Sequence, residues 1–425
     1  MNRAEGVGQV QLEAALPVGA DPRRHARALA EVREAALAGT TLPGRPRAVI
    51  GASWQRMRRL GLDPDHGSPT PPLAPEQLEA RRRGSGLATV LPALRGGLIG
   101  LAEQAAHIMV VVDADGRVLW RDGSTAVRRR ADGLGFVEGA DWHEPATGTN
   151  AIGTALVARH PVQVYSAEHY VSNQHDWTCA AAPLHDPRNG RLLGAVDLSG
   201  PASTVHPSTL ALVDAVAKLA EAHLRTTHLS DLERLRGLAT PLLAKVKGRA
   251  VITDPHGWIA ASAGLVPVGR IALPNDAAPG RTWLPTYGNC LLEPLPGGWL
   301  VRLTEEEDAS PTRVVLDLRS SRESTLRVSG AAGTWSHRLS PRHAEMLYVL
   351  ARHRQGRSAS ELSLDLFGDA GRTVTVRAEM SRMRRHFGGF LLARPYRFDD
   401  DVEVVVERPA DGDVLPHSVA PAVRA

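Results

Sequence analysis

Between residues 373 and 387 the sequence places arginines in a pattern suited to binding a negatively charged partner. Apolar residues recur there at spacings of four, three and four, so a helix would turn them toward a core: Val376, Met380, Met383 and Phe387. At about 100° per residue, the opposite face carries short or positively charged side chains: Thr375, Ala378, Ser381, Arg382 and Arg385. Arg377 and Arg384 flank the apolar stripe.

Such a face suits the major groove of double-stranded DNA. Arginine pairs with guanine edges or phosphates, and short side chains let a helix approach the bases closely. The region from Pro311 to Phe398 holds 16 arginines against 7 acidic residues, a balance of +9, which leaves −5 for the rest of a chain of net charge +4. A basic module on an acidic body indicates a phosphate-binding function. The alternatives are a solvated basic face on an ordinary helix and a chance asymmetry of charge.

The elements around this helix follow a regular order. Three short strands are predicted first, at 314–318, 325–328 and 334–337. Ser340 is a good N-cap for a helix that ends near Gly356, and Ser358 with Glu361 forms a capping box for a second helix. After the third helix, a hairpin is predicted from two short strands, 390–393 and 396–398. Arg394 and Arg397 lie in that hairpin and are candidate DNA contacts.

In this order of elements, residues 311 to about 407 resemble the DNA-binding domains of OmpR-class response regulators and actinobacterial antibiotic regulators. The segment TVRAEMSRMRRHF, residues 375–387, is similar to the recognition helix of that family. The resemblance implies a winged helix-turn-helix domain with the hairpin as its wing. The hairpin departs from the family pattern because the usual glycine before Tyr396 is missing and three aspartates follow at 399–401, which weakens the expectation for Arg394 and Arg397.

A second motif lies in the amino-terminal half. The segments WHEPATGTNAIGTAL (142–156), TCAAAPLHDP (178–187) and GAVDLSG (194–200) resemble the GAF domain of acetoin-operon activators, and the likeness extends over about residues 45–224. The resemblance implies a sensor that encloses a small-molecule effector between a sheet and helices. Thr149 is expected to cap the helix that follows it. The candidate ligand-binding residues are Trp142, His143, Asn150 and Cys179, and Trp177 is a further candidate for an apolar wall.

The cysteine and histidines of this region raise three other possibilities: redox sensing, haem or metal binding, and sulfoxide reduction. Cys179 is a redox sensor if its thiolate is stabilised, or else a plain buried small residue. The histidines at 143, 160, 169, 175 and 185 could ligate haem or a metal, but no two share the short helical spacing of such a site, so no cofactor is predicted. A GAF-type sulfoxide reductase is disfavoured because it needs more than one nearby cysteine, and the other cysteine, Cys290, lies outside this domain.

The activators that the sensor resembles usually carry a central ATPase. No Gly-Lys dipeptide occurs in the sequence, so it contains no Walker phosphate loop. The expected mechanism is therefore to recruit or exclude RNA polymerase through DNA binding, without ATP hydrolysis.

The rest of the chain sets the domain organisation. Amphipathic helices are predicted at 22–38 and within 43–61, followed by a proline-rich linker at 63–75. A helix at 207–236 carries apolar residues at a seam-like spacing and pairs either with a second copy or with its own domain. Residues 249–303 predict a small PAS-like sheet, whose function cannot be inferred from the sequence. The acidic run at 305–308 predicts a linker. No internal repeat is evident.

Together these patterns predict an α+β multidomain protein. The expected parts are a helical region and linker (1–80), a GAF-type sensor with a signalling helix (81–236), a PAS-like sheet and acidic linker (237–310), a winged-helix domain (311–408) and a tail (409–425). With 43% hydrophobic residues and no apolar stretch of membrane-spanning length, a cytoplasmic protein is expected. The predicted function is a ligand- or redox-responsive transcription regulator, homodimeric and not an enzyme. The alternative is a signalling scaffold whose winged helix binds protein.

Overall fold

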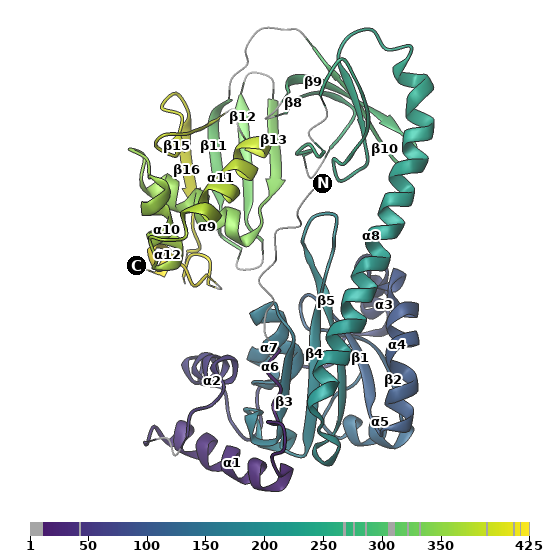
Figure 1. Cartoon of the computed structure of the whole chain (residues 1–425), viewed down its shortest axis with the longest axis vertical. Helices are drawn as coiled ribbons and strands as arrows, with labels where there is room; N and C mark the ends of the chain where they lie inside the picture. The colour runs from purple at the N-terminus through teal and green to yellow at the C-terminus, as the bar shows by residue number, and fades with distance from the viewer. Residues whose placement is uncertain are drawn as a thin grey trace. The chain divides into compact units, whose positions relative to one another are not determined.

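The computed structural model of the chain describes residues 12–41, 44–266, 269–274, 277–284, 287–304, 311–320, 323–330, 333–387, 390–410, 413–416 and 418–424. The chain divides into two compact units between Thr226 and Thr227, and each unit mixes helices with β-sheet (Figure 1). Among the described residues, no helix combines the length and the hydropathy that a membrane crossing requires. The predicted acidic linker at 305–308 lies outside the described residues.

The first unit is built on an antiparallel sheet of five strands in the order β2-β1-β5-β4-β3. The strands are β1 (Ile108–Asp113), β2 (Val118–Gly123), β3 (Val162–Tyr165), β4 (Trp177–His185) and β5 (Leu192–Pro201). Both faces of β1 are buried, so its sequence is a continuous apolar run without alternation. The sheet is therefore the middle layer of this unit.

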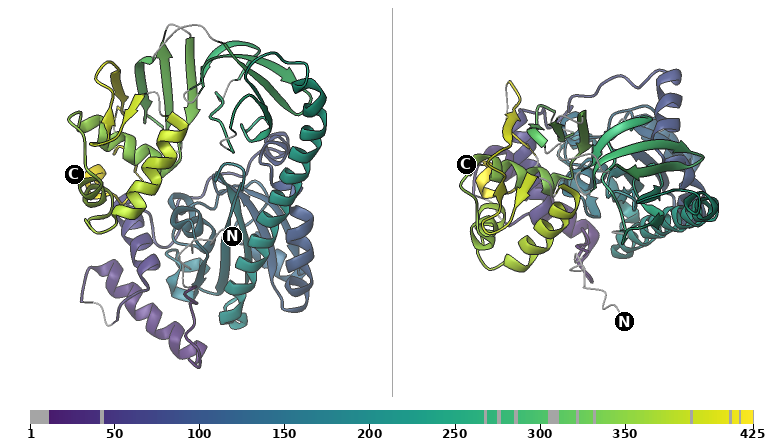
Figure 2. Two further views of the ribbon diagram at one scale, coloured as in Figure 1. Left: turned by 45° about the horizontal axis from the view of Figure 1, so that its top comes forward. Right: turned by 90° about the horizontal axis from the view of Figure 1, so that it is seen from above.

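Helices cover both faces of this sheet. They are α1 (Pro22–Ala38), α2 (Ala48–Leu60), α3 (Pro75–Gly84), α4 (Leu91–Gln104), α5 (Thr125–Asp132), α6 (Glu144–Thr147), α7 (Ala151–Ala158) and the start of α8 (Pro207–Leu243). Short 3-10 turns lie between them: η1 (Leu87–Thr89), η2 (Ser166–Glu168), η3 (Ser172–Gln174) and η4 (Ala202–Thr204). One face packs on α2 and α7, and the other packs on α4 and α8 (Figure 2).

The apolar seam of α8 faces its own unit. Its buried members pack with α4 and the sheet: Leu210, Val213, Ala217, Ala220 and Leu224. The sequence left open whether this seam pairs with a second copy or with its own domain. In the structure, the seam packs within its own domain. A different face of the helix exposes Leu219 and Leu229.

The amino-terminal helices belong to the same unit and are not separated from it by a linker. The backbone N–H of Ser68 donates to the carbonyl of Ala146 at 2.9 Å, and that of Leu73 donates to Gly139 at 3.1 Å. Residues 63–75, which we interpreted as a domain-separating linker, thus run along the surface of the first unit, with backbone hydrogen bonds at Ser68 and Leu73. Proline-rich composition indicates the absence of helix and strand here, but not the absence of packing.

The second unit begins with another antiparallel sheet of five strands, in the order β7-β6-β10-β9-β8. The strands are β6 (Ala250–Thr253), β7 (Ile259–Ala263), β8 (Gly280–Leu284), β9 (Gly288–Leu295) and β10 (Gly298–Leu303). The carboxy-terminal part of α8 covers one face through Leu232, Leu235, Ala239 and Leu243. Numbered from its own first strand, this sheet has the same strand order as the first sheet, 2-1-5-4-3.

The first hairpin is also built alike in the two sheets. Asp113 is the last residue of β1 and Asp254 directly follows β6, and each Oδ1 accepts hydrogen bonds from the backbone N–H groups two and four residues later at 2.8 to 3.0 Å. The turn is completed by Gly116 and Gly257 with φ of 79° and 83°. Only glycine adopts that conformation without cost, so the same turn is selected twice.

Glycine marks a second matching place, in the last strand of each sheet. A Cβ atom on Gly194 would lie 1.9 Å from the carbonyl oxygen of Val112, and one on Gly298 would lie 1.9 Å from that of Thr253. Any side chain at either position would collide with the neighbouring strand. The two sheets are therefore a structural repeat, which the sequence did not reveal.

The two cysteines of the chain fall at matching positions of this repeat. Cys179 pairs with Ser199 in the sheet register, and Cys290 pairs with Leu303. Ser199 and Leu303 each lie five residues after the glycine of their strand. Both cysteines are buried and free.

The carboxy-terminal part of the second unit contains a sheet in the order β13-β12-β11-β16, with β16 parallel to β11. Its strands are β11 (Pro311–Asp317), β12 (Thr325–Gly330), β13 (Gly333–Arg338) and β16 (Glu403–Glu407), and a hairpin is formed by β14 (Leu391–Leu392) and β15 (Arg397–Phe398). The helices are α9 (Pro341–Arg352), α10 (Ala359–Phe367), α11 (Thr373–Phe387) and α12 (Pro421–Arg424).

Capping in this part follows the sequence signals. Ser340 accepts a hydrogen bond from the N–H of His343, and Ser358 with Glu361 forms the predicted capping box of α10. The segment that we expected to be a tail packs against these helices: Ala420 is fully buried, and the Ser418 hydroxyl donates to Glu345 at 2.7 Å.

Candidate functional site

Helix α11 has a buried face and an exposed face. The predicted apolar stripe is buried: Val376, Met380, Met383 and Phe387. Trp335 of β13 meets the Phe387 ring at 5.8 Å between centroids, which anchors the end of the helix on the sheet. The exposed side chains are those predicted for the opposite face and its flanks: Thr375, Arg377, Ala378, Ser381, Arg382 and Arg384. The side chain of Arg385 lies outside the described residues.

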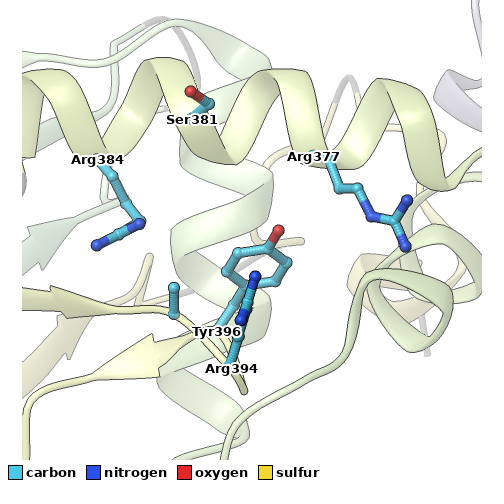
Figure 3. A pocket seen from close by; sticks show the side chains of 6 residues that line it. Arg377, Ser381, Arg384, Arg394 and Tyr396 are labelled. Atoms are coloured by element: carbon cyan, nitrogen blue, oxygen red, sulfur yellow. The ribbon is translucent and has the colours of Figure 1, made fainter.

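A hollow of about 410 Å³ lies between α11 and the β14–β15 hairpin (Figure 3). Its walls are formed by Arg377, Ser381, Arg384, Ala393, Arg394 and Tyr396. Figure 3 shows Arg377 and Arg384 leaving the helix on the side that faces the hairpin residues Arg394 and Tyr396. Three guanidinium groups around one hollow create a positive potential that suits phosphate.

The other predicted arginines are engaged with acids. Arg382 forms an ion pair with Glu379 at 2.5 Å, and Arg397 forms one with Asp400. Arg384 also donates from Nε to the carbonyl of Leu391 at 3.2 Å, which ties the helix to the hairpin. The structure thus brings Arg377, Arg384 and Arg394 together around the hollow, while Arg397 is directed to an aspartate of the run that follows the hairpin.

A second candidate site is a small cavity inside the first unit. It holds about 10 Å³, close to the space of one water molecule. The lining residues come from β4 and from the segment between β2 and β4: Leu134, Phe136, Trp142, His169, Gln174, Trp177 and Cys179. The Phe136 and Trp142 rings lie 4.0 Å apart between centroids, so the wall is largely aromatic.

Two polar side chains on this wall have unused hydrogen-bonding atoms. His169 donates from Nδ1 to the carbonyl of Ser166 at 2.9 Å, and Gln174 donates from Nε2 to the carbonyl of Thr147 at 2.9 Å. His169 Nε2 and Gln174 Oε1 are buried and find no hydrogen-bond partner among the described residues. Burial lowers the pKa of His169 to about 3, so its ring is neutral at physiological pH and Nε2 is an acceptor.

An acid lies beside the cavity on the same face of the sheet. Asp197 is fully buried, and burial raises the pKa of its carboxyl to about 8, so it is mostly protonated at neutral pH. Ser199 donates to Asp197 Oδ2 at 2.5 Å, and Oδ1 has no partner within the described part of the chain. Burial and this carboxyl also raise the pKa of the Cys179 thiol well above its ordinary value, which disfavours a thiolate redox sensor.

The sequence-predicted ligand residues divide into two groups. Trp142, Trp177 and Cys179 line the cavity. The His143 ring is hydrogen-bonded through Nδ1 to the Asp141 carboxylate instead. Asn150 caps α7 through its side chain and donates to the carbonyl of Trp142 at 3.2 Å.

The expectation that Thr149 caps α7 is wrong. Asn150 is the N-cap, and the Thr149 hydroxyl lies 2.6 Å from the hydroxyl of Ser53 on α2. Beside it, Glu144 receives hydrogen bonds from Arg56 and Thr154. Much of the motif at 142–156 therefore attaches α2 and orders α7.

Sequence reasoning missed the polar members of the cavity. His169 was considered only as a haem or metal ligand, and Gln174 was not singled out. His169 follows the 3-10 turn η2 and Gln174 ends the turn η3, and such short turns have no periodicity that would indicate which side chains point inward. No group of three or more metal-ligating side chains occurs within the described residues.

The first unit is similar to parts of known transcriptional regulators. Residues 27–222 match the family model described as MimR, N-terminal domain. The chain is 36% identical over 182 residues to the acetoin dehydrogenase operon transcriptional activator AcoR of Bacillus subtilis, covering 42% of this chain and 30% of AcoR. It is 32% identical over 190 residues to the propane 2-monooxygenase operon transcriptional activator MimR of Mycolicibacterium goodii, covering 44% of this chain and 32% of MimR.

A longer match extends into the second unit. An uncharacterized 47.3 kDa protein in the thcA 5′ region of Rhodococcus erythropolis is 32% identical over 360 residues, covering 84% of this chain. The chain spans 64% of that relative and about a third of the two activators. The named relatives are transcriptional activators, which supports a regulatory role for this chain.

Proposed function

We propose that this protein is an effector-responsive transcription regulator with a GAF-type sensor in its first unit and a winged-helix DNA-binding domain near its carboxyl end. The observation that carries the DNA-binding assignment is the exposed arginine face of α11 beside a hairpin, held by a buried stripe on the opposite side. The similarity of the first unit to two transcriptional activators supports the proposed role in regulation.

In this proposal α11 enters the major groove. Ala378 and Ser381 permit close approach, while Arg377 and Arg382 reach phosphates or guanine edges. Arg394 extends the contact from the hairpin to the flanking backbone. Duplex DNA matches the hollow better than a small anion does, because its three arginines come from two separate elements spaced along a surface.

The sensor supplies the control. Relatives are named for operons of acetoin dehydrogenase and propane 2-monooxygenase, and acetoin and propane are small uncharged compounds. We propose that a small effector in the first unit alters DNA binding in a homodimer. RNA polymerase would then be recruited or excluded without ATP hydrolysis by this chain, which has no Gly-Lys dipeptide and hence no Walker loop. No catalytic role is proposed.

The test is binding of the full chain to a short labelled duplex of mixed sequence, measured by fluorescence anisotropy at several salt concentrations. The double variant Arg377→Ala with Arg382→Ala should weaken binding by about 100-fold and reduce the salt slope by about two. Arg327→Ala is the matched control, because this arginine is exposed on β12 away from the hollow. Equal losses in both proteins would contradict the assignment of α11.

The same titration distinguishes DNA binding from a second candidate function, which is protein binding. The pairing of Arg382 with Glu379 and of Arg397 with Asp400 lowers the free positive charge near the hairpin, which favours a protein partner over DNA. A protein-binding scaffold would show weak duplex binding with little salt dependence, since no counterions are released.

A further inference from the structure

We propose that the small cavity lined by Trp142, His169 and Gln174 in the first unit is the effector site and that its effector is a small uncharged molecule carrying at least one hydroxyl group. The proposal rests on the effector-responsive function proposed above. It specifies where the effector binds, which side chains recognise it and what chemistry it must have.

The first argument is the hydrogen-bonding balance of the wall. His169 and Gln174 are 1% and 5% exposed, both line the cavity, and each donates one hydrogen bond to a backbone carbonyl. Each also has an acceptor without a partner among the described residues, Nε2 of His169 and Oε1 of Gln174. Two buried acceptors require a donor from the occupant. A hydroxyl group supplies a donor, whereas an ether, a ketone or a hydrocarbon does not.

The second argument is charge. The seven residues that line the cavity include no arginine or lysine, and the ring of His169 is neutral because burial lowers its pKa. Asp197, next to Cys179 on the sheet, is held mostly protonated by burial. A carboxylate or phosphate would therefore lose its hydration without gaining a cation. An ammonium group would find only a carboxyl that burial keeps neutral.

The third argument comes from the matching face of the second sheet. The N–H of Trp142 donates to Gly116, and that of Ile271 donates to Gly257 at the equivalent turn. Ile271 belongs to an apolar core there, in place of an aromatic cavity wall.

The buried acid Asp197 of the first sheet also has an apolar residue at the matching position of the second sheet. Asp197 lies three residues after Gly194, and Val301 lies three residues after Gly298. Val301 is fully buried in the apolar core, so the sheet forms without an acid at this position. Since polar burial is unfavourable without a partner, the polar lining of the first sheet is better explained by a ligand than by folding.

The fourth argument concerns size. About 10 Å³ accommodates one water-sized group, so the oxygen of a ligand fits and its carbon atoms must displace aromatic side chains. Phe136, Trp142 and Trp177 are the walls that must move. Binding is thereby coupled to a change in the segment between β2 and β4, and two of the three rings report on it by fluorescence.

A set of three-carbon probes tests this proposal. Propylene glycol carries hydroxyl groups, acetone carries a carbonyl alone, and lactate carries a hydroxyl with a carboxylate. Each is titrated into the full chain by isothermal titration calorimetry, with tryptophan emission as a second signal for propylene glycol. We expect saturable binding of propylene glycol, and binding of acetone and lactate weaker by about ten-fold or more, since one hydrogen bond corresponds to about that factor.

Variants assign the binding to the cavity. Gln174→Met and His169→Phe each remove one acceptor and should weaken propylene glycol binding by about ten-fold. Cys290→Ala is the matched control, because it changes the equivalent strand position of the second sheet and should leave the affinity unchanged. Circular dichroism melting of each variant checks that the fold is retained.

The proposal is overturned by any of three results. The first is that propylene glycol does not bind to the folded chain, which would make the cavity a water site. The second is that lactate binds as tightly as propylene glycol. The third is that both wall variants bind propylene glycol with normal affinity. DNA binding measured on the same samples keeps the two proposals separate, because loss of the effector site leaves the basal affinity of α11 for duplex DNA intact.

Discussion

The two five-stranded sheets differ most on the face that α8 does not cover. In the first sheet this face carries the buried polar pair Asp197 and Ser199, next to a cavity. In the second sheet the matching positions are Val301 and Leu303, which pack with Trp335 of the carboxy-terminal part. The same strand order, turn and glycines thus support two kinds of interior. The difference teaches that the polar interior of the first sheet is an addition to the fold and not a requirement of it.

The second sheet uses this face for attachment. Trp335 of β13 donates from its indole N–H to the carbonyl of Ala272 at 3.0 Å, and both residues lie in one apolar core. Trp335 also contacts the ring of Phe387 at the end of α11, so it packs between the segment at Ala272 and this helix. Residues 237–303, whose role was not readable from the sequence, form the structural base of the carboxy-terminal helices.

The largest effect is expected from substituting the two glycines at matching positions of the five-stranded sheets. Gly194→Ala and Gly298→Ala each place a Cβ 1.9 Å from a carbonyl oxygen of the neighbouring strand. Each should lower the free energy of unfolding by about 5 kcal/mol or prevent folding of its unit. Urea unfolding followed by circular dichroism measures this. A mild effect at one position and a severe effect at the other would break the equivalence; Gly96→Ala in α4, where a Cβ meets no atom within 4 Å and φ is not left-handed, is the control.

The next largest effect concerns the buried acid. A carboxyl whose pKa is near 8 when folded and 3.8 when unfolded destabilises the protein progressively as pH rises through that interval, because the unfolded chain releases the proton first. Asp197→Asn removes this penalty and should raise the free energy of unfolding at pH 7 by up to about 4 kcal/mol. The pH dependence of urea unfolding between about pH 4 and pH 8 should flatten accordingly.

The converse substitution is the control for that prediction. Val301→Asn puts an amide into the matching apolar place of the second sheet and should destabilise it by about 2 kcal/mol. Destabilisation by both substitutions at pH 7 would mean that Asp197 has an ionic role in the fold.

Helix α8 offers an intermediate effect. Leu210 packs on the first sheet and Leu235 packs on the second. Each leucine-to-alanine substitution should cost about 3 kcal/mol, and the loss should be confined to the unit in which the leucine is buried. Native-state hydrogen exchange resolves the two units. Equal loss of protection in both units from either substitution would show that they unfold as one.

The smallest effect is expected from the cysteines. Cys179→Ala and Cys290→Ala should each cost about 1 kcal/mol, since each removes one buried sulfur. Burial raises the pKa of Cys290 to about 12 and that of Cys179 well above its ordinary value. Neither thiol should therefore react with a thiol reagent at neutral pH until the chain unfolds. Rapid reaction at Cys179 alone would restore the redox alternative for the first sheet.

The sequence predicted the local features that depend on neighbouring residues. The capping box at Ser358 and the apolar stripe of α11 follow from short-range geometry, and both are present. The exposed arginine face could be located in the same way, because helical spacing places side chains without knowledge of the tertiary fold.

Features that depend on distant partners were not predictable. The relation of the two sheets rests on a few positions, such as Gly194 with Gly298, too widely spaced for a sequence repeat to be recognised. Thr149 could have capped a helix, but its hydroxyl is drawn to Ser53, almost a hundred residues earlier. The acceptors of the cavity came from irregular turns, where sequence carries little information on side-chain direction.

Helix α8 is a single helix of 37 residues that contributes buried side chains to both units. Its rise of about 1.5 Å per residue makes it a rod of roughly 55 Å whose two halves share one hydrogen-bonded backbone. One residue inserted near Thr226 would turn the second half by about 100° about the helix axis, whereas seven residues would nearly restore its phase. The phase of α8 at Thr226 therefore decides which of its side chains can pack on the sheet of each unit.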